Sequence, residues 1–335
     1  MKKIIMDIDS VGDDILAVIY MTLKSEADIL GITTVNGASG DIRQATWVAQ
    51  NLVSFLKKDI PVYAGADQPL VMDVSEKKGD PVNFAEIYKG KFGSRLTKLN
   101  ERAIKPKKEI ETKSAIDFLI ESVNKYPGEI TLVTTGPLTN IALALEKDWE
   151  ICHKIKEAYV LGGAFKIHGN ISPVTEYNIY ADPEAAKKVL ESDMNITLVP
   201  LDVCENNTFS DSMLTYEALS QLERGKINRI AEYVCDKFPI YIDVWKEYFE
   251  LEGFPMDDVI TAALALDETF CEYTEPLHVT VELAGEFSRG QSIAFTGKQI
   301  NSYPEREKKN VKIANFINGK KFMNDFIKTI NLSTD

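Results

Sequence analysis

Short apolar segments alternate with amphipathic segments along most of this 335-residue chain. The apolar segments predict strands at 3–8, 29–35, 60–64, 129–135, 157–161 and 196–203. Apolar residues at helical spacing between them predict helices at 13–23, 42–57, 114–125 and 137–146, with another beginning at Asp182. Such alternation is typical of a mostly parallel sheet with helices on both faces, so we expect an α/β fold. No linker or repeat interrupts the pattern, which predicts a single domain over residues 1–335.

The charge balance limits the partners of this chain. It has 38 Lys and Arg against 51 Asp and Glu, a net charge of −13, with 44% hydrophobic residues. An acidic surface repels phosphate backbones and anionic lipids, so we expect no nucleic-acid or membrane binding. No apolar run approaches the roughly 18 residues that a membrane-spanning helix requires. The first residues do not resemble a signal peptide, which predicts a cytoplasmic protein.

Cysteine and histidine are sparse and scattered. The four cysteines do not form a C-x-x-C pair, and they are typical of reduced, mostly buried thiols: Cys152, Cys204, Cys235 and Cys271. None of the three histidines has a histidine partner at zinc-ligand spacing: His153, His168 and His278. A histidine-based zinc site is therefore not expected. The G-x-S-x-G, P-loop and G-x-G-x-x-G motifs are also absent.

An acidic turn follows the first predicted strand, with carboxylates at Asp7, Asp9, Asp13 and Asp14. One interpretation is a solvated turn and helix cap. Another is a site for a hard cation, because Ca²⁺ and Mg²⁺ bind several oxygens and offset the repulsion between carboxylates. The turn also matches the short D-x-D-x-[TV] opening of haloacid dehalogenase-like phosphatases, with Asp7 as nucleophile and Asp9 as acid.

Three further polar segments follow predicted strands or precede a predicted helix. They are the stretches LVTTGPLTN at 132–140, GGA to EYN at 162–178, and MDD at 256–258. Taken singly, they are typical of a strand-to-helix turn, a polar loop and a helix N-cap. Amide and carboxylate groups in such loops also suit the hydroxyls of a sugar.

Together these segments resemble the nucleoside hydrolase family, the inosine-uridine-preferring N-ribohydrolases. The resemblance covers nearly the whole chain, and its most specific part is the series GN, TEYN and DPEAA at 169–186. It also includes ILGITTV at 29–35 and a late strand at VELAGEFSRGQS. The resemblance implies hydrolysis of a ribonucleoside to base and ribose in cytoplasmic nucleoside salvage. It also implies one bound Ca²⁺ and a homodimer or homotetramer.

The resemblance assigns a role to each matching position. The implied Ca²⁺ ligands are the carboxylates of Asp9, Asp14 and Asp257 and the backbone carbonyl of Thr135. Asp9 matches the general base that deprotonates the metal-held water, and Asp7 a carboxylate behind the ligands. The implied ribose contacts are Asp13 and Asn178 at the 2′ and 3′ hydroxyls, Asn170 and Glu176 near the 5′ hydroxyl, and Asp257.

This chain departs from the family pattern mainly on the base side. Ser10-Val11-Gly12 replaces the common Pro-Gly opening, and Ala38 occupies a usual Asn position. Met256 stands where the family commonly has a His that contacts or protonates the base. We therefore expect a non-standard or modified base, such as that of queuosine, or activation by another group. The other candidates are His168 and the aromatic stretch 233–249.

Two alternatives from other classes stay open at this point. A haloacid dehalogenase-like phosphatase would use Mg²⁺ and a phosphate ester. A nucleoside-binding protein would retain the ribose contacts and lack turnover because of Met256.

Overall fold

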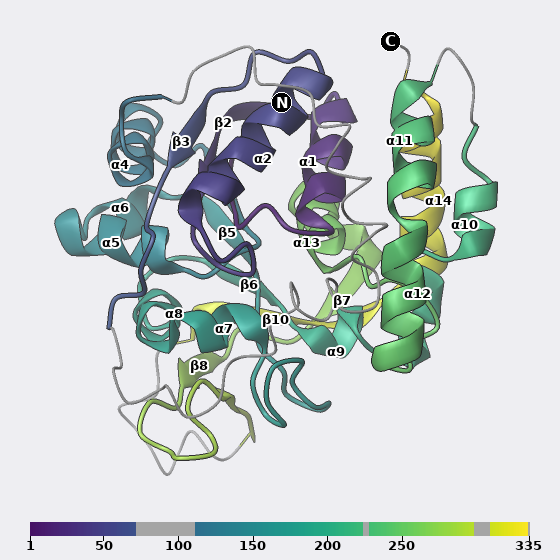
Figure 1. Ribbon diagram of the computed structural model, residues 1–335. Coiled ribbons are helices and arrows are strands. Elements are labelled where there is room, and N and C mark those ends of the chain that lie inside the picture. The colour runs from purple at the N-terminus through teal and green to yellow at the C-terminus, as the bar shows by residue number, and fades with distance from the viewer. Residues whose placement is uncertain (72–110, 224–227, 298–308, 334–335) are drawn as a thin grey trace.

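A computed structural model describes residues 1–71, 111–223, 228–297 and 309–333 (Figure 1). An eight-stranded sheet runs in the order β3-β2-β1-β4-β5-β6-β10-β7. Its strands are β1 (Lys2–Ile8), β2 (Ala27–Thr34), β3 (Val62–Ala64), β4 (Ile130–Thr134), β5 (Glu157–Leu161), β6 (Ile196–Val199), β7 (Cys271–Tyr273) and β10 (Val311–Ile317). Every neighbouring pair is parallel except β10 and β7. The mostly parallel α/β sheet is thus confirmed.

Helices cover both faces of the sheet, as predicted (Figure 1). The cluster on one face includes residues of α1 (Asp14–Leu23), α2 (Ile42–Phe55), α11 (Arg229–Lys237), α13 (Asp257–Leu266) and α14 (Gly319–Asn331). The cluster on the other face includes residues of α4 (Ala115–Lys125), α5 (Thr139–Lys147), α6 (Ile151–Lys154), α7 (Tyr177–Ala181) and α8 (Pro183–Leu190).

The strands supply both cores by alternation. In β1, Ile4 and Met6 pack into the first cluster and Ile5 into the second. In β5, Tyr159 belongs to the first cluster and Val160 to the second. Successive side chains of a strand point to opposite faces, so a strand buried on both faces is apolar along its length. This explains why the sequence shows short apolar runs rather than alternating polarity.

Two segment predictions need correction. The strand expected at 196–203 ends at Val199, and a short helix, α9 (Leu201–Cys204), follows Pro200. Proline has no backbone N–H for the ladder and suits the start of a helix. The expected late strand at VELAGEFSRGQS is mostly a connection between two antiparallel strands, β8 (His278–Val281) and β9 (Ser292–Phe295).

The segment at 211–255, which includes the aromatic stretch 233–249, is largely helical. It contains the end of a 3-10 helix (Asn207–Ser212), followed by α10 (Tyr216–Ser220), α11 and α12 (Pro239–Tyr248). Pro239 begins α12, where its fixed φ is compatible with a first helical turn. Residues 73–112 are polar and lysine-rich, which predicts loops with short helices, and almost all of them lie outside the described residues.

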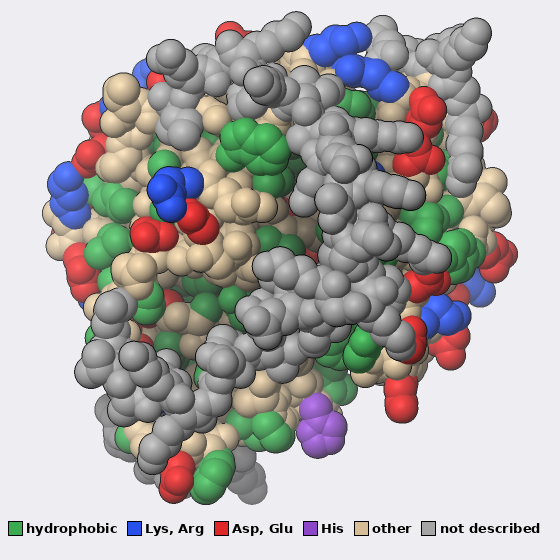
Figure 2. All heavy atoms as spheres, viewed as in Figure 1, with side chains coloured by type: hydrophobic (Ala, Val, Ile, Leu, Met, Phe, Trp, Pro, Cys, Tyr) green, Lys and Arg blue, Asp and Glu red, His purple; other side chains and the backbone are tan. Residues whose placement is uncertain are grey.

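The surface agrees with the charge argument. On the face shown in Figure 2, the described Lys and Arg side chains are scattered among Asp and Glu and form no basic stripe. In the described part of the chain, no helix combines the length and apolar character needed to span a membrane.

Candidate active site

The candidate site lies where several parallel strands end. Asp9 follows β1, Thr135 follows β4, Glu176 lies in the segment after β5, and Glu205 follows α9 after β6. Asp257 is the first residue of α13, which packs against α1, β4 and β5. The carboxyl ends of strands in such sheets are the usual location of ligand sites.

Asp9 is held by close approach of two loops. Its Oδ2 accepts a hydrogen bond from the Ala38 amide at 2.8 Å, and the side chain is 5% exposed. A Cβ atom on Gly37 would lie 2.2 Å from that oxygen, so only glycine permits this contact. At Ala38, the contact with Asp9 is therefore made by the backbone amide.

The loop after Asp9 takes an unusual path. Ser10 has φ = 63° and Gly12 has φ = 52°, both in the left-handed region. A proline at position 10 could not adopt this angle, because its ring fixes φ near −65°. The loop therefore differs in conformation from a Pro-Gly opening. A strained non-glycine residue beside a buried acid is typical of a functional site.

Thr135 links the acidic turn to the ribose-side residues. Its hydroxyl donates to Asp14 Oδ1 at 2.5 Å, and its amide donates to the Asp7 carbonyl at 2.9 Å. The Thr135 carbonyl accepts from Asn178 Nδ2 at 3.0 Å. A carbonyl oxygen has two lone pairs, so this hydrogen bond leaves one for another ligand.

The acids of the site pair with one another. Asp9 neighbours Asp14, Asp13 neighbours Asp258, and Asp257 neighbours Glu205, so these carboxyl groups affect one another's ionisation. Close like charges disfavour ionisation of both partners. Burial, followed by neighbouring acids, raises the pKa of Asp14, Asp257 and Asp258 well above the ordinary range.

Two buried carboxylate oxygens of this cluster, Asp7 Oδ2 and Asp257 Oδ1, make no hydrogen bond with the described residues. An unpaired buried oxygen costs free energy, so a ligand that binds it would stabilise the site. Hard oxygen donors and unpaired acids fit a Ca²⁺ or Mg²⁺ ion. Among the described residues, however, no three of these acids place a carboxylate oxygen within 4.8 Å of one another. A shared ion therefore requires rotation of these side chains toward one another.

The predicted ribose-side residues come together at the start of α7. Glu176 accepts hydrogen bonds from the amides of Asn178 (2.7 Å), Ile179 (3.0 Å) and Gly163 (3.2 Å). Asn170 Oδ1 accepts from the Tyr177 amide at 2.9 Å. Burial raises the pKa of Glu176 to about 7. The structure thus fixes the Glu176 carboxyl and the Asn170 amide on adjacent backbone.

Two acids that the sequence reasoning did not single out join this cluster. Glu205 Oε1 accepts from Asn170 Nδ2 at 3.1 Å, and the same side chain pairs with Asp257. The Asp258 backbone N–H donates to Asp13 Oδ2 at 2.9 Å. The strand-end rule could have indicated Glu205, because it follows the sixth predicted strand.

Residues expected on the base side occupy different environments. Met256 is 0% exposed and belongs to the first hydrophobic cluster. His168 is exposed, and its Nδ1 lies 3.2 Å from the Pro173 carbonyl. From the aromatic stretch, Tyr241 packs against Phe254 with 5.1 Å between ring centroids. A Cβ built on Gly12 would lie 3.8 Å from the Tyr241 ring, so this ring borders the acidic turn.

The environment of Asp7 argues against the phosphatase alternative. Asp7 is fully buried, and its Oδ1 accepts from Thr33 Oγ1 at 2.5 Å and Asn140 Nδ2 at 2.8 Å. A nucleophile must reach the phosphorus atom of its substrate, and Asp7 is enclosed by the sheet. Its position instead supports the acidic turn from behind.

Known proteins resemble this chain along its whole length. Residues 4–324 match the family described as inosine-uridine preferring nucleoside hydrolase. A probable uridine nucleosidase 2 of Arabidopsis thaliana is 31% identical over 93% of this chain and 92% of its own length. A pyrimidine-specific ribonucleoside hydrolase of Escherichia coli is 28% identical over 90% of this chain and 91% of its own.

A solved structure gives the same result. The purine-preferring ribonucleoside hydrolase from Gardnerella vaginalis is 29% identical, with a TM-score of 0.85 over 98% of both chains. The fold, the strand-end acids and the sequence match agree, so the chain belongs to the inosine-uridine preferring nucleoside hydrolase family and is a ribosyl hydrolase.

Proposed function

We propose that this enzyme uses a bound Ca²⁺ to hydrolyse a ribonucleoside to free base and ribose. The proposed ligands are the carboxylates of Asp9, Asp14 and Asp257 and the carbonyl of Thr135. The unpaired Asp257 Oδ1 is the observation that carries this proposal, because it is a buried hard donor with no protein partner. When bound, the ion would lower the pKa of a water and orient the ribose diol.

The acids act on the reaction in two ways. Asp9 accepts the proton of the attacking water, a contribution of about 10²–10⁴ in rate. Its hydrogen bond from Ala38 orients the carboxylate for that transfer. Cleavage of the N-ribosidic bond leaves positive charge on the ribose ring, as in glycosidases. The surrounding carboxylates stabilise this charge because they lie in a buried environment of low dielectric constant.

Asp13 and Asn178 bind the 2′ and 3′ hydroxyls in this proposal, and Asn170 and Glu176 bind near the 5′ hydroxyl. The Asn178 amide nitrogen already donates to the Thr135 carbonyl. Ribose contact and metal position are therefore joined through one hydrogen bond. This connection predicts that a missing ribose hydroxyl lowers kcat as well as affinity.

The base is the least conventional part of the proposal. Met256 cannot donate a proton, and its side chain lies in the core. We therefore infer a base that leaves without help from position 256, such as the modified base of queuosine. Uridine is the second candidate, because relatives of similar length are named uridine nucleosidases. Its cleavage would use another acid, and Tyr241 is positioned beside the acidic turn.

Ribose release from queuosine, uridine, inosine and nitrophenyl riboside tests this proposal. We expect nitrophenyl riboside and queuosine to be cleaved faster than inosine by roughly the 10²–10⁴ that acid catalysis supplies. Efficient cleavage of uridine or inosine would contradict the modified-base proposal. A Tyr241→Phe variant would then show whether that hydroxyl supplies the proton, and Tyr233→Phe in the same aromatic region is the matched control.

The single domain over residues 1–335, the cytoplasmic location and the homodimer or homotetramer are also proposed. Sedimentation of the full chain would measure the oligomeric state.

A further inference from the structure

Three potential metal ligands of different chemistry lie together away from the candidate active site. The Cys152 sulfur, a ring nitrogen of His153 and a carboxylate oxygen of Asp193 are all within 4.8 Å of one another. The thiol is buried, whereas the imidazole and the carboxylate are exposed. A cation held between them would therefore have one side open to water.

The backbone that carries these ligands is rigid on both sides. Cys152 and His153 lie on α6, and its residues Ile151 and Cys152 pack into the second hydrophobic cluster. Asp193 lies in the turn between α8 and β6. Asn310 Nδ2 donates to the carbonyls of Leu190 (3.3 Å), Ser192 (3.0 Å) and Met194 (3.0 Å) and so clamps that turn.

We propose that Cys152, His153 and Asp193 form a binding site for zinc or a similar divalent cation. Thiolate, imidazole and carboxylate are the three ligand types of zinc, and water completes the tetrahedron. Ligand atoms of a tetrahedral zinc are separated by about 3.5 Å, so closure needs only a small rotation of the exposed side chains. Binding releases the thiol proton to solvent. Spacing along the sequence did not predict this site, because Asp193 is brought to α6 by the fold.

The proposed site lies at the amino ends of the strands, whereas the acid cluster lies at their carboxyl ends. Residues 152 and 153 precede β5 and residue 193 precedes β6, whereas Glu176 and Glu205 of the candidate active site follow these two strands. An ion here would connect two strand entries and stabilise the fold without contact with substrate. Its ligand set includes sulfur and nitrogen, which Ca²⁺ does not favour.

Cobalt substitution of the full-length, reduced protein tests the proposal directly. We expect one equivalent of Co²⁺ to produce a near-ultraviolet thiolate-to-cobalt charge-transfer band that zinc displaces. The band should be lost in Cys152→Ser and weakened at least tenfold in apparent affinity by His153→Gln or Asp193→Asn. Cys152 is buried, whereas His153 and Asp193 are exposed. The two exposed substitutions therefore test the site in a folded protein even if Cys152→Ser does not fold. Cys271→Ser, which removes a partly exposed thiol outside the proposed site, should retain the band.

Zinc should also raise the Tm of the wild type by a few degrees and leave that of His153→Gln unchanged, with ribose release equal in both proteins. Absence of the band would overturn the site. A band that persists in both His153→Gln and Asp193→Asn would also overturn it, since the thiol alone would then bind the metal. Neither result bears on ribonucleoside hydrolysis, because the oxygen ligands of the active site give no thiolate band.

Discussion

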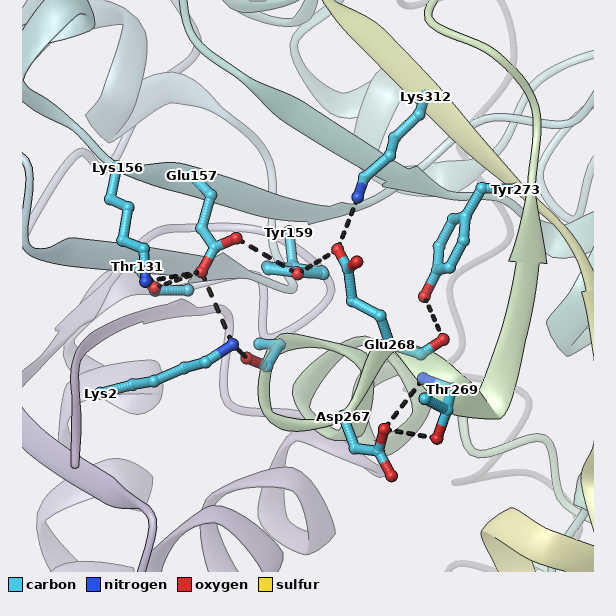
Figure 3. Close-up of polar contacts among 11 residues, drawn as sticks. Lys2, Thr131, Lys156, Glu157, Tyr159, Asp267, Glu268, Thr269, Tyr273 and Lys312 are labelled. Carbon is cyan, nitrogen blue, oxygen red and sulfur yellow. Dashed lines mark hydrogen bonds and ion pairs between the residues drawn. The ribbon is translucent and has the colours of Figure 1, made fainter.

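The acids at the two ends of the parallel strands differ in their burial and in their partners. At the amino ends, Glu157 and Glu268 are matched by basic and hydroxyl groups (Figure 3). At the carboxyl ends, Asp9, Asp14 and Asp257 are matched mainly by other acids. Both ends belong to strands of one sheet, so the fold itself does not require acids that lack basic partners.

The amino-end network shows how this protein stabilises carboxylates when stability is the only requirement. Glu157 accepts from Thr131 at 2.9 Å and lies 3.6 Å from Lys2. Glu268 receives Lys312 at 2.5 Å and the Tyr159 hydroxyl at 2.7 Å. Burial opposes ionisation of Glu268, but these hydrogen bonds outweigh it and lower its pKa.

Hydroxyl and amide groups donate to the carboxyl-end acids, but among the described residues no lysine or arginine forms an ion pair with them. Burial raises the pKa of these acids, and neighbouring carboxylates raise it further. An isolated buried charge costs several kcal/mol, so such a cluster persists where a ligand supplies the missing positive charge. The contrast supports the proposal that the acid cluster binds a cation and stabilises the positive charge of the ribosyl transition state.

The largest expected effect is at Asp9. Asp9→Asn should lower kcat by about 10²–10⁴, because it removes the base, and should weaken Ca²⁺ binding. Glu157→Gln at the other edge is the matched control and should change kcat less than twofold. Steady-state kinetics and calcium titration of both variants measure the difference. Equal activity of Asp9→Asn and the wild type would remove Asp9 from the mechanism.

The second effect concerns the sugar. A 2′-deoxyribonucleoside should be cleaved about 10- to 100-fold less efficiently than its ribonucleoside, because Asp13 or Asn178 is left unpaired at about 1–3 kcal/mol. The loss in kcat/KM is measured with matched substrate pairs. Equal rates for the two sugars would show that these residues do not read the diol.

The third effect tests Glu205 as a positioning residue. Glu205→Ala should lower kcat/KM by about tenfold, since Asn170 loses its acceptor and Asp257 its partner. Glu205→Gln should recover most of this loss, because its amide oxygen still accepts from Asn170. A 5′-deoxyribonucleoside should show a smaller loss for Glu205→Ala, because Asn170 then has no hydroxyl to bind. The same loss with both sugars would indicate a purely structural role.

The fourth effect is on stability and has a defined sign. The pKa of Glu176 is raised from 4.5 to about 7, so the folded state binds more protons than the unfolded state between these values. This contribution to stability is fully present below pH 4.5 and is lost as the pH rises through about 7. Chelator-treated protein should therefore have a lower Tm at pH 8 than at pH 5. Added Ca²⁺ should reduce that difference by binding ionised acids, and a rising Tm without metal would contradict the argument.

The smallest expected effect is on stability, at the amino ends of the strands. Lys312→Met should destabilise the fold by about 1 kcal/mol or less, because the Lys312–Glu268 pair is partly exposed to solvent. Its kcat should equal that of the wild type. Denaturant unfolding with parallel kinetics would measure both quantities. A large loss of activity would show that the two ends of the strands are not independent.

The sequence predicted the parts of the molecule that depend on local pattern. The strand at 157–161 was placed correctly, and the helix from Asp182 begins with Asp182 as its N-cap. The insertion of β10 between β6 and β7 was not predicted, because strand pairing across the chain leaves little local signal.

The candidate site was also predictable only in part from the sequence. The position of Thr135 beside Asp14 follows from neighbouring parallel strands, and sequence reasoning brought both to one edge. The pairing of Glu205 with Asp257 depends on how α9 and α13 pack, which no short motif encodes. The burial of Met256 likewise became visible only in the fold.

Calcium reconstitution tests the central claim most directly. Chelator-treated enzyme is titrated with Ca²⁺ while ribose release from nitrophenyl riboside is followed, with Glu157→Gln and Asp9→Asn in parallel. We predict that wild type and Glu157→Gln lose activity on chelation and recover it with one equivalent of Ca²⁺, whereas Asp9→Asn does not recover. Full activity in the metal-free enzyme, or recovery that is independent of Asp9, would contradict the assignment of the acid cluster as a calcium-dependent catalytic site.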